Sequence, residues 1–557
     1  ILQGPSATAI FGSVGANGVI MITTKKGRSG DTKISASTLW TIQDKPKYIP
    51  VMNLPQYADY RNEIAKAGGT SSDSLFADPS VLGNGTNWQA AMFRQTLLQK
   101  HQLSLSGGND KTTFYFSGEY FDQNGIAPGS GFSRGSLRLN LENQTRSWLK
   151  FGTNLSVSQT NEKVTTTNAG MITLAIQQAP SIPVKNPNGT WGGPTNTQFQ
   201  FTNPLALAAI NNDYNKSMAF IGGGYADITF LKGLVFHNEV NTSIQYTNNY
   251  TFHPSYVFNG YVNATTTGSR NAGNNFWWNF NSRLQYDTKI GLHSISAMVA
   301  HESSAWGYES LSGSRNNWVT NAIQELSGGD QTTSIANSSR GDGAKESYFG
   351  RLGYIYNDRY ILQLTDRYDG SAAFGPEKRW GNFPAVSAAW RISQENFMKN
   401  VSAINDLKLR VEYGLTGNSN ATGYYAVLQA VPTAWGTGFL SQNFSNPAMQ
   451  WEVDKTINLG FDLNMLNNRI ELIFDAYQKN SDKLLTVNPH AFLYGGDISY
   501  SAGYIQWPTT NVGSMQNKGI GITLNTVNIK KKDFAWKTGF NISFDRNKIT
   551  SLQTPIN

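Results

Sequence analysis

Residues 136–158 have the sequence SLRLNLENQTRSWLKFGTNLSVS, in which apolar and polar side chains alternate along two successive segments. Leu137, Leu139 and Leu141 fall on one face of an extended chain, and the polar residues between them fall on the other. After a short polar stretch the alternation resumes at Leu149 and continues to Val157. This period of two predicts a pair of strands, each with one apolar and one polar face, joined by a turn.

The alternation recurs along the chain, which predicts an all-β protein. It is found again in residues 458–464, 470–477 and 540–545. A soluble β-sandwich would alternate as well, but residues 216–231 and 536–548 form segments longer than the five or six residues of an ordinary soluble strand. Long strands favour a transmembrane antiparallel β-barrel over a sandwich.

The connections between these segments support the barrel. Tight turns at 231–233, 357–359 and 466–468 alternate with long excursions, as in outer-membrane barrels. Tyr354, Tyr356 and Tyr360 stand beside a tight turn, where an interfacial aromatic girdle is expected. Counting segments gives roughly 16–17 strands, because each run of alternation is one strand. The long loops are expected near residues 160–215, 248–275, 304–344, 416–453 and 480–515.

The composition excludes several classes of protein. Of the 557 residues 39% are hydrophobic, and no apolar run approaches the roughly 18 residues of a membrane-spanning helix. The absence of cysteine excludes disulfide scaffolds, thiolate metal sites and cysteine nucleophiles. The net charge of +8 is scattered, and its densest cluster, Lys530–Lys532, is typical of a solvated turn. We therefore expect no nucleic-acid partner.

The glycine-rich opening, IFGSVGANG at residues 10–18, has the appearance of a phosphate-binding loop. Gly12, Gly15 and Gly18 give G-x-x-G-x-x-G, which is not the dinucleotide fingerprint, and no Gly-Lys-Ser/Thr follows. Residues 19–24 are predicted as a strand, so no helix N-terminus is present to bind a phosphate. We expect tight turns here and no nucleotide or other cofactor.

Two further features concern the loops. Asn53 and Pro55 mark the start of a helix over residues 54–67. Aromatic side chains among small polar neighbours are suited to stacking on sugars or peptide side chains, or to packing the loops together. Four of them are candidate substrate contacts: Trp191, Tyr424, Tyr425 and Trp435. Trp451, in contrast, is expected to be structural.

An enzyme would need a catalytic constellation, and the sequence offers none that is specific. His293 and His301 share a strand face, but eight residues of strand separate them by roughly 26 Å, too far for one metal ion. Asp366 and Asp369 could imitate a glycosidase pair, although a structural role is favoured. We expect no catalytic residues and no metal site.

Blocks along the whole chain resemble SusC-like TonB-dependent outer-membrane transporters. PSATAIFGSVGANGVIMITTKKG at residues 5–27 resembles the end of the family's plug domain, with Phe11 where the family usually has tyrosine. RYDGSAAFGPEKRWGNFPAVSAAWRIS at residues 367–393 resembles its most characteristic barrel block. Residues 87–126, 407–420, 446–485 and 511–525 resemble further barrel segments in the family order.

The resemblance implies an architecture. Residues 1–30 would be the C-terminal part of the plug, and residues 31–557 would form most of a barrel that has 22 strands in the full protein. Phe11, Gly12, Gly15, Asn17 and Gly18 would belong to the plug motif, which has a structural or gating role. The signal peptide, the TonB box, most of the plug and the last strands would lie outside this sequence.

The resemblance also implies a function, which is active import across the outer membrane of a Gram-negative bacterium. TonB, energised through ExbB and ExbD, would act on the plug, and a SusD-like lipoprotein would cover the outer mouth. An oligosaccharide, or alternatively a peptide, would be the substrate. A siderophore or cobalamin receptor of the same superfamily is the alternative, and a plugless porin or adhesin is disfavoured by residues 1–27.

Overall fold

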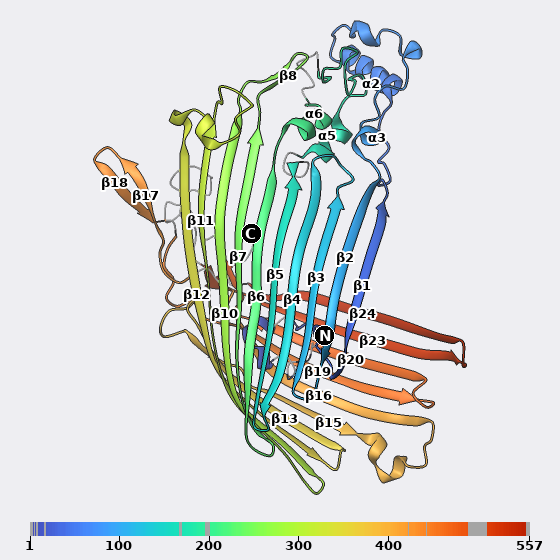
Figure 1. Cartoon of the computed structure of the whole chain (residues 1–557), viewed down its shortest axis with the longest axis vertical. Coiled ribbons are helices and arrows are strands. Elements are labelled where there is room, and N and C mark those ends of the chain that lie inside the picture. Colours follow the sequence, from blue (N-terminus) through green and yellow to red (C-terminus); the bar gives the residue numbers. More distant parts are fainter. Residues whose placement is uncertain are drawn as a thin grey trace.

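The computed structural model of the chain describes residues 4, 6, 9–15, 18–165, 170–194, 201–420, 423–441, 443–487 and 509–552. Its main feature is one antiparallel sheet of 18 strands that curves into a wall (Figure 1). β14 and β15 both pair with β13, one after the other, so the wall is 17 strands wide. The predicted all-β class and the strand number are confirmed. No helix in the described part of the chain is long and apolar enough to span a membrane.

The strands of this sheet are β1 (Gly30–Gln43), β2 (Thr96–Gly108), β3 (Thr112–Asn124), β4 (Ser130–Arg146), β5 (Leu149–Val164), β6 (Tyr214–Leu231), β7 (Leu234–His253), β10 (Thr267–Ile290), β11 (His293–Asn316), β12 (Ile335–Tyr356), β13 (Tyr360–Ser371), β14 (Trp380–Asn382), β15 (Ala385–Arg391), β16 (Ile404–Asn418), β19 (Glu452–Met465), β20 (Ile470–Asp482), β23 (Ser514–Lys530) and β24 (Ala535–Ser551). Each strand pairs with the next one in this order, except that β15 pairs with β13 and not with β14. Among the described residues β1 and β24 are the two edges, each with one partner.

Short hairpins and helices occupy the connections. The hairpins are β8 (Tyr256–Phe258) with β9 (Tyr261–Asn263) and β17 (Leu428–Thr433) with β18 (Gly436–Ser441), and β21 (Leu485–Val487) pairs with β22 (Thr509–Asn511). The α-helices are α2 (Leu54–Ala67), α3 (Trp88–Met92), α5 (Met171–Gln177) and α6 (Pro204–Ile210). Figure 1 shows all four helices gathered at one end of the upright strands β1–β12. The helix expected over 54–67 is confirmed, and Asn53 and Gln56 form its capping box.

The predicted alternation of tight and long connections is confirmed, but two long loops are shorter than expected. Asn357 and Asp358 both have positive φ, which suits the turn between β12 and β13. The loops expected at 248–275 and 304–344 are largely strand, because β7, β10, β11 and β12 continue through them. These strand ends are rich in Ser, Gly and Asn and sustain no regular alternation, yet their backbone groups still pair with neighbouring strands.

The sheet separates its side chains into an apolar and a polar face. Directly paired residues on one face include Phe116 with Leu139, Leu352 with Leu364, and Phe461 with Phe474. Many of these apolar side chains are exposed, which is the pattern of a wall surrounded by lipid. The opposite face carries the polar residues described below.

The predicted aromatic girdle lies on the apolar face at the tight-turn end. Tyr356 pairs with Tyr360, and their rings stack 6.4 Å apart. The phenol of Tyr360, together with the Trp390 indole and the Arg359 guanidinium, donates to Glu395. Glu395 lies in the turn between β15 and β16, and these donors, the Tyr360 hydroxyl foremost, hold the pKa of its carboxyl below the ordinary value.

The buried apolar clusters lie in the connections and at the outer strand ends. The largest cluster packs α3, α5 and α6 against β8, with Trp88, Met171 and Leu207 among its members. A second cluster contains Phe374, Phe383, Met449 and Trp451. The outer loops are therefore folded elements with their own cores.

The N-terminal segment, which comprises the described residues before β1, namely 4, 6, 9–15 and 18–29, differs from its prediction in one respect. η1 (Ala9–Gly15) is a short 3-10 helix kinked at Gly12, which confirms a tight turn there. Residues 20–29, however, are not part of a strand, so the strand expected over 19–24 is wrong. Several backbone groups of the segment bond to side chains of the wall and not to the backbone of a neighbouring strand, so these contacts do not form a strand ladder.

Candidate functional site

The polar face of the sheet receives the N-terminal segment through a cluster around Ser6. The Ser6 backbone N–H donates to Glu412 of β16 over 3.3 Å. The Ser6 hydroxyl donates to Ser387 of β15 over 3.0 Å and accepts from Gln363 of β13 over 2.7 Å. Gln363, Ser387 and Glu412 all lie on the same face, since each pairs directly with the next. Three strands thus bind a single serine from far away in the sequence.

Gly12 lies against a buried ion pair on β13. Its backbone has φ 62° and ψ −147°, a conformation that is essentially restricted to glycine. A Cβ on Gly12 would overlap the Arg367 guanidinium and would lie 2.8 Å from Oδ2 of Asp369. Only glycine therefore allows the segment to approach the wall this closely.

The ion pair behind Gly12 also binds the segment. Arg367 Nε contacts Asp369 Oδ1 at 2.6 Å, and both side chains are at most 5% exposed. Arg367 Nη1 donates to the Ile10 carbonyl over 2.7 Å, and its Nη2 donates to Ser347 over 2.9 Å. Glu302 lies 3.5 Å away. Burial of a guanidinium is tolerated here because it is surrounded by acceptors.

The second half of the segment crosses β3 to β6. Lys26 forms a 2.6 Å ion pair with Glu142, which also accepts from Tyr225 and contacts Lys150. Asn140, a buried residue of β4, donates to the Lys25 carbonyl over 2.5 Å. The segment therefore contacts two separate parts of the wall through polar groups.

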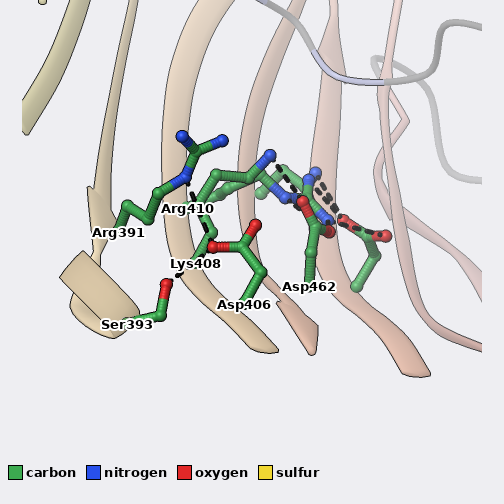
Figure 2. Close-up of polar contacts among 8 residues, drawn as sticks. Arg391, Ser393, Asp406, Lys408, Arg410 and Asp462 are labelled. Atoms are coloured by element: carbon green, nitrogen blue, oxygen red, sulfur yellow. Dashed lines mark hydrogen bonds and ion pairs between the residues drawn. The ribbon is translucent and has the colours of Figure 1, made fainter. Parts of the chain in front are cut away.

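A ladder of opposite charges continues along the polar face toward the tight-turn end (Figure 2). Lys408 and Arg410 of β16 both contact Asp462 of β19, at 2.6 and 2.8 Å. Arg410 also contacts Asp475 of β20 at 3.1 Å. At the turn end Arg391 and Ser393 share Asp406, as Figure 2 shows. Charges on this part of the wall are paired with one another.

This arrangement can hold the segment reversibly. Five hydrogen bonds of 3.3 Å or less join residues 6–13 to the wall in the described part of the chain. At about 1 kcal/mol net for each bond, they contribute about 5 kcal/mol. Each of these bonds can be exchanged singly for a bond to water. If the segment were paired with the sheet as an additional strand, its release would require a whole ladder of backbone hydrogen bonds to break. A modest pull could therefore detach the segment while the ion pairs within the wall remain.

The predicted plug-motif residues fall on this segment. Phe11 is half-buried within η1, and Gly12 and Gly15 are buried. Gly18 has φ 97° and donates its N–H to the Gly15 carbonyl, which forms a second tight turn. Asn17 lies outside the described residues. The role assigned to the motif remains a prediction.

The four candidate substrate contacts do not form one site, although the rings of Tyr424 and Tyr425 lie edge to face with centroids 5.7 Å apart. Trp191 packs against the cluster of α3, α5 and α6, with the Lys185 ammonium 4.7 Å above its ring. Tyr424 packs against the second cluster, whereas Tyr425 is exposed. Trp435 is 98% exposed at the tip of the β17–β18 hairpin. Trp435 and Tyr425 are thus available to a ligand, and Trp191 and Tyr424 contribute to loop packing.

The positions of three residues in the structure decide two expectations from the sequence. Trp451 is 4% exposed and donates its indole N–H to the Arg379 carbonyl, so its structural role is confirmed. Asp366 and Asp369 are three residues apart on one strand and lie on opposite faces of the sheet, so they do not form a glycosidase pair.

Sequence reasoning missed most of the wall residues that bind the segment. Arg367, Glu412 and Glu142 were not singled out, although a polar face of alternating residues on strands such as β13 was visible. A signal was present in the Arg–x–Asp spacing at 367–369, which places two opposite charges on one strand face. The partner segment, about 360 residues earlier, carries no signal of its own for this contact.

The chain was compared with known proteins. Residues 179–555 match the family described as "TonB dependent receptor-like, beta-barrel". TonB-dependent receptor P3 of Formosa agariphila is 30% identical, over 99% of this chain and 54% of its own length. TonB-dependent receptor SusC of Bacteroides thetaiotaomicron is also 30% identical, over 99% and 56%.

The solved structure of the RagAB peptide transporter has the same fold. It superposes with a TM-score of 0.86 at 24% identity, over 98% of this chain and 65% of that one. The chain spans about half the length of the curated relatives it matches. Since the family match covers more than half of the chain, the chain belongs to the TonB-dependent receptor-like β-barrel family.

Proposed function

We propose that the protein imports an oligosaccharide or a peptide across the outer membrane of a Gram-negative bacterium. The import depends on TonB, energised through ExbB and ExbD, and on a SusD-like surface lipoprotein that covers the outer mouth. Support comes from the family, from a relative named SusC, and from the likeness to the fold of RagAB, which is described as a peptide transporter. Residues 1–30 form the end of the plug, and residues 31–557 form barrel wall.

One observation carries the proposal: the N-terminal segment is attached to the polar face of the wall by separable polar contacts. A transporter has to keep its lumen closed at rest and open it on demand. Contacts such as Arg367 to Ile10 and Ser6 to Glu412 keep the segment in place. A force on the plug would break them one at a time, and water would replace each lost partner.

The wall itself has to stay intact while the plug moves. Its strand ladders and its internal pairs, such as Arg410 with Asp462, do not involve the segment. The charged face left behind is wettable and offers a polar path for a hydrophilic substrate. The proposal contains no catalytic step.

A siderophore or cobalamin importer of the same superfamily is the second candidate. The hairpin region, residues 423–441, carries the exposed side chains of Tyr425 and Trp435 and contains no Asp, Glu, Lys or Arg. Aromatic surfaces without charge are suited to stacking on neutral sugars or apolar peptide side chains. This observation favours the glycan or peptide over a charged chelate.

The experiment is growth of a deletion strain on single nutrients. The full-length gene should restore growth on a glycan or a peptide mixture as sole source, and it should fail to do so without TonB. A deletion that also removes the lipoprotein gene should lower uptake at limiting substrate. If the deletion affects growth only when iron or cobalamin is limiting, the second candidate is correct.

A further inference from the structure

Arg351 of β12 is a cation on the polar face for which the described residues provide no partner. Its side chain is half-buried, and its Nε is buried without a hydrogen bond. It pairs directly with Met298 on one side and Thr365 on the other, so it shares a face with both. Arg367, two residues after Thr365 on β13, forms ion pairs with Asp369 and Glu302. Among the described residues, Arg351 thus lacks the acidic partners that Arg367 has.

Thr365 shows the same deficiency independently. It is 4% exposed, and its Oγ1 is buried without a hydrogen-bond partner in the described part of the chain. A buried hydroxyl without a partner costs roughly 1–3 kcal/mol. Ala385, which pairs with Thr365 on the far side, has no polar side-chain atom to offer. Two adjacent buried polar groups on the polar face, one of them charged, therefore lack an acceptor among the described residues.

We propose that Arg351 and Thr365 form a carboxylate-binding site on the inner wall. A planar carboxylate can accept two parallel bonds from a guanidinium, and a third from a neighbouring hydroxyl. A neutral amide would satisfy the geometry but would leave the guanidinium charge unpaired in a partly apolar setting beside Met298. Thr365 lies two residues from Gln363 on the same strand face, and Gln363 binds Ser6, so a bound carboxylate would lie beside the docked segment.

The carboxylate has two possible sources, and the inference rests on the proposed function for one of them only. It belongs either to an acidic side chain from another part of the full-length protein or to the molecule being transported. In the first case the site helps to hold the lumen closed. In the second case it favours acidic substrates on their path.

The test uses the full-length protein in a cysteine-free background with a single reporter, Ala9→Cys. Ala9 is 1% exposed in the docked segment, so maleimide labelling of the cysteine measures undocking. The variants are Arg351→Gln and Thr365→Val, with Arg351→Lys as a rescue that retains the charge. Arg340→Gln is the matched control, since Arg340 is on the same strand but 74% exposed. Heat-modifiable migration on a gel verifies the folded barrel.

A carboxylate from the protein itself predicts at least tenfold faster labelling for Arg351→Gln without any substrate, a smaller increase for Thr365→Val and Arg351→Lys, and none for Arg340→Gln. This readout needs no transport, so it remains valid if the proposed function fails. A carboxylate from the substrate predicts unchanged labelling but at least tenfold weaker binding of an acidic peptide, with its amidated counterpart unaffected. If Arg351→Gln behaves as Arg340→Gln in both assays, water satisfies these groups and the inference is wrong.

Discussion

Replacing Gly12 with alanine should loosen the N-terminal segment from the wall. The backbone of Gly12, at φ 62° and ψ −147°, costs an alanine about 1–3 kcal/mol. The new methyl group would also overlap Arg367 and approach Asp369 Oδ2, so the bond from Arg367 to the Ile10 carbonyl would be displaced. A hydrogen bond from a charged group is worth about 1.5–3 kcal/mol. Together these effects predict a loss of about 4 kcal/mol in docking.

The Ala9→Cys reporter measures this loss. Each 1.4 kcal/mol changes the equilibrium constant tenfold, so labelling of the Gly12→Ala variant should be faster by a factor of several hundred, up to the rate of the free thiol. Gly170→Ala is the control, because Gly170 also has φ 62° but has open space around the site of its Cβ. That variant should leave labelling unchanged. If Gly12→Ala labels no faster than Gly170→Ala, Gly12 does not control docking and the reasoning is refuted.

Three further predictions concern other parts of the molecule. Asn140→Ala, which removes the bond to the Lys25 carbonyl, should raise the rate of tryptic cleavage after Lys25 about tenfold, at roughly 1–1.5 kcal/mol for a hydrogen bond; an unchanged rate would show that the second contact region does not hold the segment. The pKa of Glu395 is lowered by Tyr360 and its other donors, so its contribution is complete above the ordinary glutamate pKa of 4.5 and is lost as pH falls through the lower folded value. Hydrogen exchange of the β15–β16 turn should therefore accelerate in that acidic window, and Glu395→Gln should remove the pH dependence. Trp435→Ala should weaken substrate capture without lowering the melting temperature, because the side chain is 98% exposed, whereas Tyr424→Ala should lower the melting temperature; the reverse pattern would contradict the packing described for the two residues.

The sequence by itself determined the local structure. Strict alternation in residues 136–158 specified the strands and their apolar face, because side-chain direction in a strand depends only on position parity. The turn at 357–359 and the helix over 54–67 were equally predictable, since positive-φ residues and a capping box act within a few residues. Where Ser and Gly are frequent, as in residues 304–316, the alternation is not sustained although the strand continues.

The tertiary structure alone decided the docking site. Ser6 lies 406 residues from Glu412 in the chain, and Ile10 lies 357 residues from Arg367. No local pattern marks such pairs, because each contact arises only when strand pairing brings β13, β15 and β16 side by side. The same holds for Arg351 and Thr365. The residue type determines which groups a side chain can bind, but the folded sheet determines which groups lie within its reach. Among the described residues, neither the Arg351 Nε nor the Thr365 hydroxyl has a partner within reach.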